Sequence, residues 1–193
     1  MLKSLILAAT LLVATSAQAL NTNSVSTFLV KAQVASIQEN VVAFGPNWKV
    51  GDENNYKLNM GGFLNGTMKM YVREIGADGI WLVQDVDMMI QKQKIEMLLD
   101  ANTGEVKKVL VDGREEQLPE SDLEVIEQKE ANITVPAGTF ASIYLKIKDN
   151  ANNGQISEMW VNPRDIPISG MLKSIQDSQL GKVTIELTSF IKK

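Results

Sequence analysis

The stretch from Ile133 to Ile147 reads ITVPAGTFASIYLKI and combines a turn and a strand within fifteen residues. Pro136 has no backbone N–H to donate to a sheet, so it belongs at a strand end, an edge or a bulge. Gly138 permits the sharp change of direction that follows. After it, apolar and polar residues alternate, which is typical of a half-buried strand. The stretch therefore predicts a corner between two strands, with Phe140 returning to the core.

The same alternation continues along most of the chain from Tyr56 onward. The apolar positions of its three clearest runs are Met68, Met70 and Val72; Ile80, Leu82 and Val86; and Ile95, Met97 and Leu99. The runs are separated by turn formers that include Gly61-Gly62 with Asn65-Gly66, Asp112-Gly113, and Asn150 to Gly154. Turn signals at intervals of roughly ten residues indicate a meander of antiparallel strands.

Two segments depart from this alternation. Asn23 to Glu39 has apolar residues at i, i+3, i+4 and i+7 and predicts an amphipathic helix, although an alternation from Val30 to Val34 competes with it. Pro163 and Pro167 exclude a regular strand, so we expect a loop that can include a helical turn at Met171 to Ile175. The predicted fold class is mainly β with some α (α+β): a curved antiparallel sheet or incomplete barrel of about 9–11 strands, with one or two helices packed on it.

Residues 1–19 have the features of a secretory signal peptide. Lys3 supplies positive charge, and Leu5 to Ala14 is an apolar run too short to span a bilayer. Ala17-Gln18-Ala19 matches a small-x-small cleavage site, so we expect cleavage after Ala19 and a periplasmic or secreted protein. An uncleaved membrane anchor is the alternative, but no stop-transfer flank follows. Residues 20–193 are expected to form one β-rich domain without an integral membrane segment, because no later run approaches ~20 apolar residues.

The composition argues against several classes of function. The chain contains no cysteine and no histidine, so it lacks the usual zinc ligands, the Ser-His-Asp triad and the Cys-His dyad. It has 19 basic and 23 acidic residues, and removal of Lys3 with the signal peptide leaves 18 against 23, a net charge of −5. This balance, without a basic run, disfavours nucleic-acid binding. We expect a protein that is not an enzyme and has no metal or other cofactor.

The order of motifs in the last third of the chain resembles a known pattern. It consists of the Val135 to Phe140 corner, a strand, a hairpin, a strand ending in EMWVNP (Glu158 to Pro163), a DIPISGMLK loop (Asp165 to Lys173) and a last alternating strand. This order resembles that of uncharacterised exported bacterial proteins whose fold is similar to the periplasmic lipoprotein carriers LolA and LolB. The close match covers Ile133 to Phe190, and before it only the order of elements agrees.

The resemblance implies an incomplete barrel that wraps helices and leaves an apolar concavity for acyl chains. Under it, Pro167 and Gly170 correspond to a proline and a glycine that recur before the final strand of such proteins. The chain departs from the carriers because it lacks the cysteine of a lipid-anchored acceptor. It also has no arginine in a leading apolar strand, where the carriers have one. The resemblance therefore implies a generic amphiphile-binding or envelope-assembly role rather than lipoprotein transfer.

The candidate ligand-binding residues are apolar. The chain has nine methionines, whose flexible side chains suit a surface for varied apolar partners, although an ordinary core filled by methionine is the simpler interpretation. Both faces of the strand around Trp81 are partly apolar, which indicates either a groove or burial under a loop. The predicted apolar lining consists of Trp81, Met88, Met89, Trp160, Met171 and Leu172. The expected ligand is a lipid-like amphiphile or a lipidated envelope protein; the alternative is a scaffold with a packed interior.

Acidic side chains offer a distant enzymatic alternative. Asp85 and Asp87 share one face of a predicted strand, and Glu96 and Asp100 could lie on its neighbour. Paired carboxylates can hydrolyse glycosides or bind Ca²⁺, but a solvated face of mixed charge is the simpler interpretation. The acidic stretch from Glu115 to Glu130 indicates a solvated sheet edge.

Overall fold

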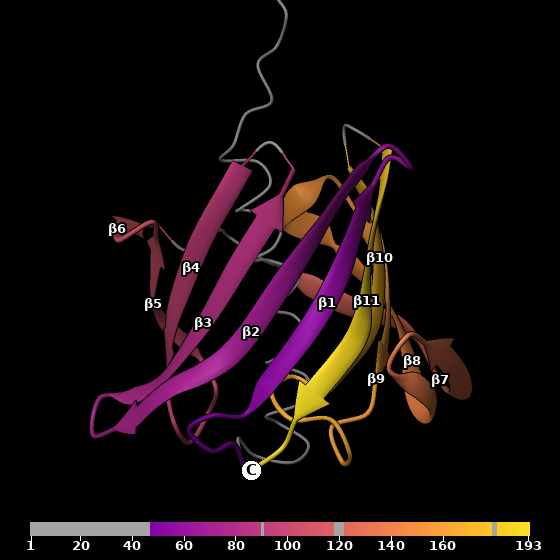
Figure 1. Ribbon diagram of the computed structural model, residues 1–193. Helices are drawn as coiled ribbons and strands as arrows, with labels where there is room; N and C mark the ends of the chain where they lie inside the picture. Colours follow the sequence, from indigo (N-terminus) through magenta and orange to yellow (C-terminus); the bar gives the residue numbers. More distant parts are fainter. Residues whose placement is uncertain (1–46, 90, 118–121, 179–180) are drawn as a thin grey trace, which may run out of the picture.

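The protein forms one antiparallel sheet of eleven strands in the computed structural model, which describes residues 47–89, 91–117, 122–178 and 181–193 (Figure 1). The strands are β1 (Glu53–Met60), β2 (Leu64–Gly76), β3 (Gly79–Met88), β4 (Gln91–Leu99), β5 (Val106–Val111), β6 (Arg114–Glu116), β7 (Leu123–Val135), β8 (Gly138–Asp149), β9 (Gln155–Val161), β10 (Met171–Ser178) and β11 (Gly181–Ile191). Within the described ranges the one helical element is the 3-10 turn η1 (Asn150–Asn152). The predicted antiparallel, mainly β class and the number of strands are confirmed.

The helical part of the prediction is not supported. Met171 to Ile175, predicted to include a helical turn, lies in β10. The pairing of β10 with β9 shifts register between Met171 and Lys173, and both Met171 and Leu172 are fully buried. Such a bulge breaks the alternation by which a strand is recognised. The helix predicted at Asn23 to Glu39 lies outside the described residues. No helix in the described part of the chain is long and apolar enough to cross a membrane.

Two meanders make up the sheet, and the first and last strands join them. The strand order is β6-β5-β4-β3-β2-β1-β11-β10-β9-β8-β7, so β1 pairs with β11 at the centre, with Leu58 opposite Ile185. β6 and β7 follow one another in the chain but form opposite edges. Exposed glutamates lie on both edges, Glu115 on β6 and Glu124 on β7. The acidic stretch therefore supplies sheet edges, as predicted.

The short link between the two edge strands requires the sheet to curve. Ten spacings of about 4.8 Å would hold the edges of a flat sheet of eleven strands about 48 Å apart. The seven residue steps from Glu116 to Leu123 can span at most about 25 Å. The sheet is therefore curved, and it remains open because β6 and β7 are not paired with one another. In Figure 1, β5 and β6 on one side and β7 and β8 on the other recede from the viewer behind β1 and β2.

The two faces of the curved sheet differ in character. The inner face carries the apolar core, which includes Leu58, Met70, Leu82, Met97, Leu145 and Ile185. Each such side chain contributes roughly 1.5–3 kcal/mol when it is fully buried. The alternation predicted for β2 is confirmed, because Met68, Met70 and Val72 are all at most 1% exposed. The residues between them, Lys69 and Tyr71, lie on the outer face.

The Val135 to Phe140 corner is the turn between β7 and β8, as predicted. Pro136 and Ala137 form the turn, and Gly138 begins β8 with a φ of 142°. The Ala137 N–H donates to the Leu187 carbonyl of β11 at 3.1 Å. Because β11 lies three places from β8 in the sheet, this bond folds the end of the hairpin onto the middle of the sheet.

The turn prediction between β1 and β2 is only half right. Gly61 and Gly62 lie in the turn, both with positive φ. Asn65 and Gly66, predicted to belong to a turn, lie inside β2 instead. A Cβ on Gly66 would come within 2.4 Å of the Met88 Sδ, so glycine here allows β3 to pack closely.

Candidate functional site

Polar side chains interrupt the apolar inner face at a few positions. Asn54 of β1 and Gln84 of β3 are both 0% exposed. They lie in one row across the sheet, because Asn54 is opposite Met70 of β2 and Met70 is opposite Gln84. The row continues to Ile95 of β4. Two strand spacings, about 10 Å, separate the backbones of the two amide-bearing residues.

The side-chain amide of Gln84 has no hydrogen-bond partner among the described residues, at either Nε2 or Oε1. The residues around it are apolar and buried: Leu82 and Val86 on its own strand, and Met70 and Ile95 opposite it. Burying an unpaired amide costs about 1–3 kcal/mol on mutational scales. Methionine would fill a similar volume without that cost.

Asn54 connects the inner face to the loop between β9 and β10. Its Nδ2 donates to the Pro167 carbonyl at 2.8 Å and to the Tyr56 hydroxyl at 3.0 Å, whereas its Oδ1 has no partner in the part of the chain that the structure describes. The Tyr56 hydroxyl in turn donates to the Met171 carbonyl at 3.2 Å. Burial raises the pKa of Tyr56 well above its usual range, so the hydroxyl stays protonated. These bonds fix the loop at one end of the inner face.

The loop, residues 162–170, is also held by its own hydrogen bonds. The Asn162 N–H donates to the Gly170 carbonyl at 2.7 Å, and the Asn162 side chain exchanges bonds of 2.7 and 2.9 Å with Asp165. Gly170 has a φ of +68°, and a Cβ there would lie 2.6 Å from the Pro163 nitrogen. The loop precedes β10 rather than the final strand, β11, which differs from the position that the resemblance implied.

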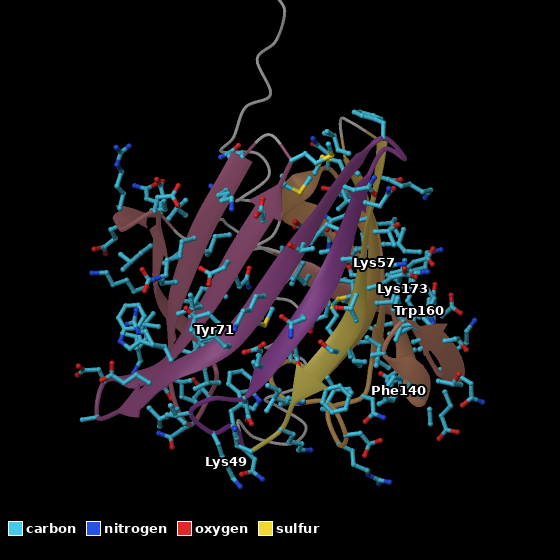
Figure 2. All side chains as sticks on the ribbon, in the orientation of Figure 1. Lys49, Lys57, Tyr71, Phe140, Trp160 and Lys173 are labelled. Atoms are coloured by element: carbon cyan, nitrogen blue, oxygen red, sulfur yellow. The ribbon has the colours of Figure 1, made fainter. Side chains whose placement is uncertain are left out.

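A row of polar and aromatic side chains crosses the outer face. We call it the outer row. Each member is directly opposite the next in the ladder, and in strand order they are Lys129, Tyr144, Trp160, Lys173, Glu186, Lys57, Thr67, Asp87 and Lys92. Figure 2 shows Trp160, Lys173 and Lys57 following one another on this side of the sheet.

An aromatic pair flanked by lysines forms one half of the outer row. The rings of Tyr144 and Trp160 lie 5.1 Å apart at 57°. Lys129 Nζ lies 4.9 Å from the centroid of the Tyr144 ring, and Lys173 Nζ lies 6.0 Å from that of Trp160. Aromatic faces attract cations at these distances, so the four side chains support one another.

Ion pairs continue the outer row toward the centre of the sheet. Glu186 accepts from Lys173 at 2.8 Å and from Lys57 at 2.7 Å. Burial alone would raise the pKa of Glu186, but the hydrogen bonds from Lys173 and Lys57 outweigh it and lower the pKa. The glutamate therefore remains ionised between its two partners.

Trp81 also lies on the outer face, away from the aromatic pair. The guanidinium carbon of Arg73 lies 4.7 Å from the centroid of the Trp81 ring, and the guanidinium pairs with Glu96. Val83 beside them is 0% exposed. A small cluster on the outer face thus explains why both faces of β3 are partly apolar.

The acidic residues considered for catalysis lie on the outer face in mixed-charge surroundings. An open groove of about 650 Å³ crosses β1 to β4 there. Asp85 stands opposite Lys69 on one side and Lys94 on the other, and Asp87 pairs with Lys92 at 2.9 Å. No cluster of three or more His, Cys, Asp or Glu residues that could hold a metal occurs in the described ranges.

Asp100 lies in the turn between β4 and β5 and not on the strand itself. It accepts hydrogen bonds from the N–H groups of Asn102 and Thr103 and pairs with Lys107 at 2.8 Å. The hydrogen bond from Lys107, with those from the two backbone groups, holds the pKa of Asp100 far below its usual range. These bonds stabilise the hairpin turn between β4 and β5.

The six residues predicted to line a groove do not gather at one place. Trp81 and Trp160 lie on the outer face, Met88 lies on the inner face, Met89 lies in a turn at 80% exposure, and Met171 and Leu172 are fully buried next to the loop. A binding role for the six stays a prediction. Sequence reasoning overlooked Asn54 and Gln84, although each is a polar residue in an otherwise apolar alternation.

Comparison with known proteins gives little further information. No family model and no curated protein matches the sequence. Among solved structures, the chain is similar to a Bacteroides fragilis protein that is inferred to be exported and has a YmcC-like fold. The two are 10% identical, with a TM-score of 0.41, and the match covers 77% of this chain and 99% of the other. Similarity of this degree carries no argument about function, and it does not link the chain to LolA or LolB.

Proposed function

We propose that the protein is an exported, non-enzymatic binding protein that holds a lipid-like amphiphile, or a lipidated envelope partner, against the inner face of its sheet. The observation that supports this proposal is the largely apolar inner face, over which neither a helix nor a second sheet packs among the described residues. A single layer needs a second apolar layer to keep such a face from water. In this proposal the apolar chain of the ligand forms part of that layer.

The outer row supports a second candidate, an envelope interaction module with a packed interior. Trp160 and Tyr144 form an aromatic pair with Lys129 and Lys173 at its ends. Aromatic residues with a polar tip are enriched where proteins bind one another. In this alternative, the interior is filled by protein alone and the partner contacts the outer face.

Direct extraction of ligand distinguishes the two candidates. The full chain would be expressed in a bacterial host, exported and purified without detergent, and solvent extracts would be analysed by mass spectrometry. Binding predicts an amphiphile in about stoichiometric amount, absent from an unrelated exported protein purified in the same way. A protein that is empty after purification, and still empty after incubation with envelope lipids, would exclude ligand binding and favour the interaction module.

A further inference from the structure

We propose that one end of the sheet docks the protein on a membrane surface of anionic lipid, through a group of cations that we call the basic patch. The basic patch consists of Lys49, Arg164, Lys192 and Lys193, all of which are exposed. The inference goes beyond the proposed function, because it concerns a surface at the end of the sheet and holds whether or not the inner face binds an amphiphile.

Hydrogen bonds bring the basic patch together from three separate segments. The Asp52 carboxylate accepts from the backbone N–H of Lys49 and from that of Lys193, each at 2.8 Å. The Lys192 ammonium donates to the Arg164 carbonyl in the loop between β9 and β10. Figure 2 shows Lys49 at the end of the molecule where the chain ends after β11 in Figure 1. The three segments lie far apart in the sequence, which is why the sequence shows no basic run.

Neighbouring side chains leave the basic patch with an excess of positive charge. None of its four cations pairs with a carboxylate among the described residues, whereas most of the other described lysines and arginines do. Two carboxylates lie nearby: Asp52 is buried and accepts from backbone N–H groups, and Asp165 accepts from the Asn162 side chain. Residues 20–46, which precede the patch in the chain, contain one lysine and one glutamate and add no net charge.

Exposed aliphatic side chains accompany these cations. Val50, which follows Lys49, is 56% exposed. Ile191, which precedes Lys192, is 45% exposed. Such a combination suits the surface of a bilayer, because the apolar groups enter between the headgroups while the cations meet the lipid phosphates. Lysine, which supplies three of the four charges, is depleted at protein–protein interfaces. The chemistry of the patch therefore favours an anionic lipid surface over a protein partner.

The test is co-sedimentation of the exported wild-type protein with sucrose-loaded vesicles. Vesicles of phosphatidylglycerol mixed with phosphatidylcholine should carry the protein down, whereas vesicles of phosphatidylcholine alone should not. Each basic side chain near an anionic surface strengthens binding about fivefold. Lys49→Gln/Lys193→Gln keeps the backbone bonds to Asp52 and should therefore bind the anionic vesicles about 25-fold more weakly. Added salt should weaken binding of the wild-type protein, because it screens exposed charges.

A control variant separates the basic patch from the net charge of the chain. Lys92→Gln/Lys182→Gln removes the same amount of positive charge at two exposed lysines that pair with Asp87 and Asp177. Lys182 lies near the start of β11, whereas the patch lies beyond its end. This variant should bind the anionic vesicles nearly as well as the wild-type protein does.

Each contrary outcome overturns a stated part of the inference. If the wild-type protein does not bind the anionic vesicles, docking on lipid is excluded, and binding to poly-glutamate instead would assign the patch to an acidic protein. Equal losses in the two double variants, with circular dichroism like that of wild type, overturn the assignment to these residues. Equal binding to both kinds of vesicle, or binding unaffected by salt, overturns the electrostatic mechanism. The proposed function is tested separately, because ligand extraction does not depend on vesicle binding.

Discussion

Replacing Gly170 with alanine is expected to destabilise the fold by about 3 kcal/mol, mostly through a backbone overlap. Gly170 has a φ of +68°, and an ordinary side chain in this conformation costs about 1–2 kcal/mol. The new Cβ would also lie 2.6 Å from the nitrogen and 2.7 Å from the Cα of Pro163. Shifting packed backbone to relieve such an overlap costs about 1–3 kcal/mol. Urea unfolding followed by tryptophan fluorescence measures the loss, provided that the m value is unchanged.

Two further variants isolate the overlap from the backbone strain. Gly113 has a φ of +79°, but a Cβ added there would meet open space. Gly113→Ala should therefore lower the free energy of unfolding by only about 1 kcal/mol. Asparagine tolerates positive φ better than alanine does, but it also has a Cβ. Gly170→Asn should therefore be nearly as unstable as Gly170→Ala. If Gly170→Ala and Gly113→Ala lose the same free energy of unfolding within about 0.5 kcal/mol, the overlap argument is refuted.

Three further predictions concern buried and paired groups. Gln84→Met should raise the free energy of unfolding by about 1–3 kcal/mol, because the variant no longer buries an unpaired amide. A lower free energy of unfolding, measured by urea titration, would contradict the conclusion that the Gln84 amide is unpaired. Burial raises the pKa of Tyr56 above its ordinary 10.0, so its contribution to stability is present below pH 10 and is lost as pH rises further. The stability of Tyr56→Phe should therefore decline less steeply than that of the wild-type protein above pH 10. An unchanged slope of stability against pH would disprove this. The pKa of Glu186 lies below its ordinary 4.5, so its contribution is present above pH 4.5 and is lost as pH falls further. Glu186→Gln should flatten the acid side of the stability profile, and a profile like that of wild type would count against the pairing with Lys57 and Lys173.

The strands were predictable wherever the side-chain period was undisturbed. In β2, Met68 and Met70 face the core because alternate residues of a strand point to one side. β10 was missed because the bulge at Met171 places two buried residues in succession. Gly66 was assigned to a turn because its close approach to β3 depends on packing that the local sequence does not show.

The candidate sites were less predictable, because they depend on register between strands. Gln84 is visible in the sequence as a polar break between Leu82 and Val86. Its lack of partners depends on Met70 and Ile95, which only the strand pairing places beside it. The outer row likewise brings together residues from nine strands, and no spacing within the sequence reveals it.

The pairing of β1 with β11 has a consequence for how the chain folds. Leu58 and Ile185, opposite one another at the centre of the sheet, are separated by most of the described chain, whereas the other neighbouring strands are joined by local hairpins. Closing a long loop costs more chain entropy than closing a hairpin, so the central pair is expected to form last and to limit the folding rate. Until then, β1 and β11 are the open edges of two half-formed sheets. Pairing of β1 with β11 within one molecule therefore competes with pairing of either exposed edge with a strand of a neighbouring molecule.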